Sequence, residues 1–114
     1  MIVRDDNNEP VNFTNPLHPR LKITIYMTGL GPTSPPLAPG EVAPATPLPL
    51  TTTPTVKLGA ATLNVTFAGL VPGQIGLDQI NATLPDVVPV GISVPLTIQQ
   101  GGFSTTVFVR VVSP

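Results

Sequence analysis

Proline is the feature of this sequence that most limits the folds open to it. The chain has 114 residues and contains 16 prolines, which are spread along its length and not gathered in one tail. A proline inside a helix removes a backbone donor and clashes with the preceding turn, so almost no window for a long helix remains. The length supports one domain with a single core. We therefore predict an all-β domain.

The apolar and charged residues indicate a core of branched aliphatic side chains under a nearly neutral surface. Leu, Ile and Val recur throughout, whereas the chain has no Trp, one Tyr and four Phe. The formal net charge of -1 offers no basic surface for nucleic acid or for an anionic membrane. The surface must be covered mainly by Thr, Ser, Asn, Gln and Pro, a composition common in secreted proteins. We therefore expect an extracellular or cell-surface location.

The absence of certain sequence features narrows the class further. The chain has no cysteine, which excludes a disulfide framework and a thiolate metal site. No apolar run approaches the length of a membrane-spanning helix, so we expect no membrane insertion. The first residues lack the basic and apolar regions of a signal peptide, and we expect Met1 to begin a fragment excised from a longer exported protein.

Alternation of apolar and polar residues predicts several short strands. From Leu21 to Thr28 the odd-numbered residues are apolar and alternate with Lys, Thr and Tyr, the pattern of a half-buried strand. Similar alternation covers residues 62–67, 79–84 and 92–99, and Gly101-Gly102 predicts a hairpin into residues 103–112. Short strands with turns at roughly 8 to 12 residues suggest a sandwich or barrel.

Other segments depart from this simple pattern. Residues 1–20 are polar and rich in turn residues, and we interpret them as a lead-in segment or edge strand, with one short strand near Val11–Phe13. Residues 21–114 would then form the sandwich domain. Residues 32–54 are rich in proline, so we expect extended chain that packs across the sandwich without central-strand pairing. Pro95 predicts that its strand lies at a sheet edge or contains a bulge.

One ordered set of motifs resembles a known family. The motifs are Tyr26–Thr33 (YMTGLGPT), Phe67–Gly73 (FAGLVPG), Gly76–Leu77, Gln79–Asn81 (QIN) and Pro85. In order and spacing they resemble the uncharacterised C-terminal domain of Solibacter-type acidobacterial secreted proteins, which is similar to immunoglobulin-like IPT/TIG modules. The resemblance covers about Asn12 to Val112, with departures at Met27, Ala60 and Asp78.

This resemblance implies an immunoglobulin-like sandwich at the end of a longer exported bacterial protein, and it implies no known activity. Combined with the strand pattern, it predicts an immunoglobulin-like β-sandwich of about seven short strands with a long Pro-rich extended connection.

The ionisable residues form no complete catalytic or metal-binding set, so we assign no catalytic, cofactor-binding or metal site. Asp5, Asp6 and Glu9 could offer oxygen ligands to calcium, but their spacing is not that of an EF-hand loop, and a solvated terminus explains them better. Whether they bind a cation stays open. His18 lacks the further nitrogen or sulfur ligands of a zinc site, and we interpret it as a turn residue. Asp78 is expected to cap a turn or strand end.

Gln79 and Asn81 are the polar pair that most needs an explanation, because they follow a Gly-Leu turn on the polar side of a strand. They either tie the 69–76 loop to that strand or contact a ligand such as a sugar, and we favour the structural role. An isopeptide bond between Lys22 and Asn81 is a further option. We disfavour it because the alternation places Lys22 in solvent.

These patterns predict a non-catalytic structural or interaction module that uses no cofactor, and the resemblance implies that it terminates a larger secreted or cell-surface protein. Its partners would be neighbouring domains or other subunits, including further copies, bound through a strand edge. One alternative is a self-assembling subunit of an extracellular filament or sheath, with residues 1–20 as an exchanged strand. Another is a carbohydrate-binding module, which the shortage of aromatic residues disfavours. A dilution series by light scattering separates the first two, because a module stays monomeric at micromolar concentration.

Overall fold

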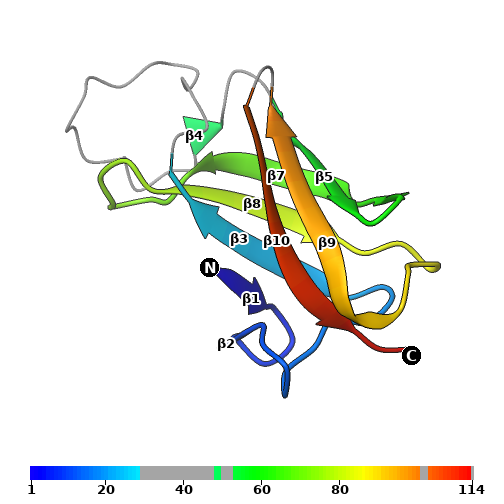
Figure 1. Cartoon of the computed structure of the whole chain (residues 1–114). Helices are drawn as coiled ribbons and strands as arrows, with labels where there is room; N and C mark the ends of the chain where they lie inside the picture. Colours follow the sequence, from blue (N-terminus) through cyan, green and yellow to red (C-terminus); the bar gives the residue numbers. More distant parts are fainter. Residues whose placement is uncertain (29–47, 50–52, 101–102, 114) are drawn as a thin grey trace.

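A computed structural model describes residues 1–28, 48–49, 53–100 and 103–113. These residues form ten strands and no helix, and the strands make two antiparallel sheets that pack face to face (Figure 1). Among them, no helix is long and apolar enough to cross a membrane. The all-β prediction is therefore confirmed.

The two sheets differ in size. The larger sheet has the order β2-β1-β3-β8-β7-β4 and the smaller sheet has the order β10-β9-β5-β6. The larger sheet contains β1 (Ile2–Arg4), β2 (Glu9–Pro10), β3 (Lys22–Met27), β4 (Leu48–Pro49), β7 (Asn64–Leu70) and β8 (Asp78–Thr83). The smaller sheet contains β5 (Thr55–Leu58), β6 (Ala61–Thr62), β9 (Gly91–Gln100) and β10 (Phe103–Val111).

The topology is that of an immunoglobulin-like sandwich. Seven of the described strands have three or more residues, namely β1, β3, β5, β7, β8, β9 and β10. Numbered along the chain, they lie in the order first-second-fifth-fourth in the larger sheet and seventh-sixth-third in the smaller one. This is the arrangement of the constant-type immunoglobulin fold. The predicted fold class is thus confirmed, while the Pro-rich connection at 32–54 lies largely outside the described residues.

The core lies between the sheets and consists of Leu, Ile, Val and Ala side chains. Alternation in β3 turns Ile23 and Ile25 inward, where they oppose Ala82 and Ile80 of β8, and all four are buried. The smaller sheet contributes Val56, Leu58, Val94, Leu96, Ile98, Val109 and Val111. Each large aliphatic side chain that becomes fully buried contributes about 1.5–3 kcal/mol to folding. The face predicted for the Leu21–Thr28 strand is confirmed.

Residues 1–20 join both sheets. β1 pairs with β3, and β2 lies beside β1 at the edge of the larger sheet. The chain then reaches the smaller sheet, where Leu17 forms a parallel bridge with Val111 and is fully buried. The short strand expected near Val11–Phe13 is not formed there. Strands lie earlier, at β1 and β2, and Asn12 makes only an isolated bridge with Asn15.

Pro95 lies in a central strand, because β9 pairs with β10 on one side and with β5 on the other. The prediction of an edge position is therefore wrong. Gly59 N–H donates to the carbonyl oxygen of Pro95 (2.8 Å), but Pro95 has no N–H to return a second bond. The proline is tolerated because β5 ends at Leu58, immediately before this position. A register shift between Val109 and Val111 places a bulge nearby in the β9–β10 pair.

Candidate functional site

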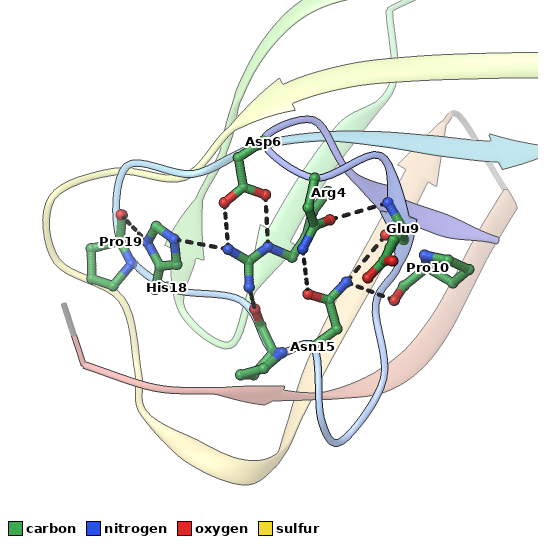
Figure 2. Close-up of polar contacts among 9 residues, drawn as sticks. Arg4, Asp6, Glu9, Pro10, Asn15, His18 and Pro19 are labelled. Atoms are coloured by element: carbon green, nitrogen blue, oxygen red, sulfur yellow. Dashed lines mark hydrogen bonds and ion pairs between the residues drawn. The ribbon is translucent and has the colours of Figure 1, made fainter.

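Arg4 is the centre of a polar cluster in the first 20 residues (Figure 2). Its guanidinium makes a bidentate contact with the carboxylate of Asp6, with 2.9 Å between Nε and Oδ1, and Nη1 donates to the carbonyl oxygen of Pro16 (2.8 Å). The planar guanidinium fork matches the two carboxylate oxygens. The cluster therefore connects β1 to the segment that leads to Leu17 and the smaller sheet, which is a structural role.

Two of the three carboxylates considered for a cation have protein partners, those of Asp5 and Asp6, whereas Glu9 is exposed on β2. The hydrogen bond from Arg4 lowers the pKa of Asp6 below its usual range, and the same contact raises the pKa of Arg4. Asp5 accepts a hydrogen bond from Thr24 Oγ1 (2.8 Å). Within the described part of the chain, no three His, Asp or Glu residues are grouped so that they could hold a metal ion.

His18 belongs to the same cluster. Its Nε2 lies 3.4 Å from Arg4 Nη2, and its Nδ1 lies 2.9 Å from the carbonyl oxygen of Pro19. Because an arginine only donates, Nε2 must accept and Nδ1 must carry the proton that Pro19 accepts. One tautomer satisfies both contacts, and the carbonyl oxygen of His18 accepts from the N–H of Leu21 (3.4 Å) across the turn that follows it.

Gln79 and Asn81 lie on the outer face of the larger sheet, opposite Tyr26 and Thr24 of β3. Both are half-buried, and neither amide side chain forms a hydrogen bond with another described residue. The 69–76 loop is closed instead by its main chain, in which the N–H of Val71 donates to the carbonyl oxygen of Leu77 (2.8 Å). The backbone, and not the two amides, therefore holds this loop. Asp78, expected at a turn or strand end, is the first residue of β8 and is buried.

A hollow of about 350 Å³ brings together the residues considered for an isopeptide bond. Lys22 and Asn81 both line it, together with Asp5, and Asn81 Oδ1 is buried without a described hydrogen-bond partner. Lys22, however, is exposed. Water therefore solvates its ammonium group, and the apolar setting that amide formation would need is missing.

The strand edges single out a different surface. Three of the four edges of the described sheets are two-residue strands: β2, β4 and β6. β2 carries Glu9 and Pro10, and β4 carries Pro49, features that resist pairing with another chain. The fourth edge is β10, which has nine residues and stands at the outside of the smaller sheet, beside β9 (Figure 1). Residues 103–109 of β10 (FSTTVFV) include no charge, glycine or proline.

The bridge at Leu17 identifies the backbone groups that β10 turns outward. The N–H of Leu17 donates to the carbonyl oxygen of Arg110 (3.0 Å), and the N–H of Val112 donates to the carbonyl oxygen of Leu17 (2.8 Å). The carbonyl group of Arg110 in β10 and the N–H of Val112 just beyond β10 thus point away from β9. Because the side that a strand residue bonds alternates along the strand, Ser104, Thr106 and Phe108 also turn their N–H and C=O groups outward.

No described segment bonds to these outward groups of Ser104, Thr106 or Phe108. Each residue carries one backbone donor and one acceptor, so the edge presents three donors and three acceptors in a row. By the same alternation, the intervening residues 105, 107 and 109 turn their N–H and C=O groups toward β9, with which β10 pairs. This edge is the candidate functional site.

Apolar side chains flank the β10 edge on the inner face of its sheet. Val107 is 43% exposed and lines a groove of about 380 Å³ between the two sheets. The apolar residues on the other walls of this groove include Ile2, Ile25, Met27 and Ile98. A strand placed beside β10 would extend over this groove.

A second apolar cluster lies near the C-terminal end of the same strand. Phe108 is 68% exposed and shares a hollow of about 200 Å³ with Phe13 and Ile92, which are also exposed. The Arg110 guanidinium lies 4.6 Å from the centroid of the Phe13 ring and donates to the carbonyl oxygen of Phe13 (2.8 Å). Gathered exposed apolar residues of this kind commonly mark interaction surfaces.

Comparisons with known protein families, with curated proteins and with solved structures find no match to this chain. The family resemblance noted from the motifs therefore stays a prediction. The sequence predicted docking through a strand edge but did not identify the strand. The uncharged run at residues 103–109 was a usable signal, although only the sheet order places it at an edge.

Proposed function

We propose that the chain is a non-catalytic interaction module that binds extended segments of protein partners along the edge of β10. In this proposal it forms the terminal domain of a larger secreted or cell-surface bacterial protein. The observation that carries the proposal is the contrast between the long, uncharged edge of β10 and the three two-residue edges elsewhere.

The mechanism is addition of a strand to the smaller sheet. In this mode the main-chain hydrogen bonds give affinity, and pockets for alternate side chains give specificity. The outward groups of Ser104, Thr106 and Phe108 would supply the hydrogen bonds. The groove beside Val107 would receive every second side chain of the bound segment.

The filament alternative receives less support from the same edges. An open filament needs two different complementary surfaces on each subunit, so that a copy bound through one surface still has the other surface free to bind the next copy. Of the described edges only β10 is long, and residues 1–20 pair with β3 and β10 of their own chain. A module with one docking edge fits this distribution better than a filament subunit does.

The proposal is tested by titrating the isotope-labelled chain with a short peptide of alternating Thr and Val and following the backbone amides by NMR. We expect the largest shifts at Ser104, Thr106 and Phe108. The Thr106→Pro variant removes one outward donor but no bond to β9, so it should fold and lose peptide binding. The matched control, Thr55→Lys on the exposed face of β5, should bind normally. Absence of shifts along β10, or binding that Thr106→Pro leaves intact, would count against the proposal.

A further inference from the structure

We propose that the partner segment is β10 of a second copy of this chain, paired antiparallel to the first on a twofold axis at Thr106. The inference rests on the proposed function, because it names the occupant of the same edge. This pairing of the two β10 strands joins the smaller sheets of both copies into one continuous sheet. The outer faces of both copies then lie on the same side of that sheet.

The register follows from the length of the free edge. Leu17 bonds to Arg110 near the end of β10 and to Val112 just beyond it, and no other described segment pairs with the outer side of residues 103–109. The middle of this run is Thr106, so pairing about that residue uses the whole free edge of both copies. Thr106 then opposes Thr106 of the second copy, and Ser104 opposes Phe108.

These opposed residues are the ones whose N–H and C=O groups face outward. In an antiparallel ladder such a pair exchanges two hydrogen bonds, so all three pairs about the axis satisfy the donors and acceptors that β10 leaves open. A register shifted by one residue would oppose outward groups to groups already bonded to β9. The alternation of the backbone therefore excludes registers shifted by an odd number of residues, and among the remaining registers the pairing centred on Thr106 uses the longest stretch of the edge.

The edge is also complementary to itself in charge and shape. No charged residue lies in 103–109, so the pairing places no like charges opposite one another. The net charge of -1 on each copy gives only weak mutual repulsion. On the inner face, Val107 of the second copy lies opposite Thr105 and covers the groove that Val107 of the first copy lines.

The twofold arrangement is closed, because each copy uses in the contact the one long edge among its described strands. The contact is a single pair of strands and therefore small, so weak association is expected. A dimer that appears only well above micromolar concentration is compatible with a module that is monomeric when dilute.

The first experiment measures association of the full chain by sedimentation equilibrium over a wide range of concentrations. The wild-type chain should form a dimer and nothing larger. Thr106→Lys should weaken the association by roughly tenfold or more, because two ammonium groups then meet at the axis. Thr106→Glu should do the same, and an equimolar mixture of the two variants should recover a heterodimer. Thr55→Lys adds the same charge to an exposed position on β5 and should dimerise like the wild type.

The second experiment does not depend on the stability of charged variants. The chain has no cysteine, so Thr106→Cys introduces a single thiol, which a short bis-maleimide should cross-link between copies. Lys57 provides the control, because it lies in line with Thr97 and Thr106 across the sheet. Five strand spacings would separate the two Lys57 positions in the dimer, about 24 Å, so Lys57→Cys should not cross-link.

Three results would overturn the inference: a wild-type chain that is monomeric at every concentration, a dimer that the Thr106 variants leave unchanged, and equal cross-linking at both cysteine positions. If the Thr-Val peptide still binds β10 in any of these cases, the inference fails and the proposed function stands. If the peptide does not bind β10 either, both fail.

Discussion

Replacing Leu17 by alanine tests whether residues 1–20 are part of the core. The Leu17 side chain is 0% exposed, and its backbone connects the first segment to Arg110 in β10 and to Val112 just beyond it. Truncating a buried leucine to alanine costs about 2–5 kcal/mol, depending on how far the cavity collapses. We expect about 3 kcal/mol, a large part of the roughly 5–15 kcal/mol that stabilises a domain of this kind. The melting temperature should fall by roughly 10–15 °C.

Urea unfolding measures this loss directly. The single tyrosine, Tyr26, reports on the larger sheet by fluorescence without interference, because the chain has no tryptophan. Far-UV circular dichroism provides a second probe, and the slope of the transition should stay constant. The control is Val87→Ala, at a position 83% exposed, which should change stability by no more than about 0.5 kcal/mol. If Leu17→Ala lowered the free energy of unfolding as little as this control does, residues 1–20 would be a lead-in segment, and the reasoning that places Leu17 in the core would be refuted.

Three further predictions concern charge, backbone and covalent state. Because the pKa of Asp6 is lower in the folded chain, its contribution to stability is complete above the ordinary aspartate pKa and is lost as pH falls through the lowered value. The urea midpoint of Asp6→Asn should therefore vary less with pH than that of the wild type below about pH 4. Gly59 and Gly73 both have positive φ, and alanine at either should cost about 1–2 kcal/mol in thermal unfolding. The loss should be larger for Gly59→Ala, whose Cβ would lie 2.8 Å from Pro89 Cγ; equal losses would contradict the contact. Intact mass spectrometry should give the mass of the unmodified sequence, because Lys22 is exposed, and a loss of one ammonia would indicate an isopeptide bond.

Local periodicity was sufficient to predict the class of fold and the face of individual strands. The alternation from Leu21 to Thr28 has a period of two, which can match only one buried face, and Ile23 and Ile25 occupy it. Sixteen prolines made long helices unfavourable, and none forms in the described residues. These predictions succeeded because they depend on neighbours in the sequence.

The features that the sequence did not predict depend on distant parts of the chain. The role of Leu17 is set by Arg110 and Val112, and a polar segment around a single leucine gives no sign of that contact. Pro95 was assigned to an edge or a bulge because local rules do not show that β5 ends opposite it. The free edge of β10 likewise follows from the order of strands in the smaller sheet, which no local pattern encodes.

Hydrogen exchange along β10 tests the central claim most directly. In a dilute sample, the amides of Ser104, Thr106 and Phe108 should exchange rapidly because they face outward, while residues 105, 107 and 109 are protected by β9. Raising the concentration should slow the outward set and leave the other set unchanged. Protection of both sets in the dilute chain, or an outward set that exchanges rapidly at every concentration, would contradict the assignment of this edge as a surface that pairs with a second copy.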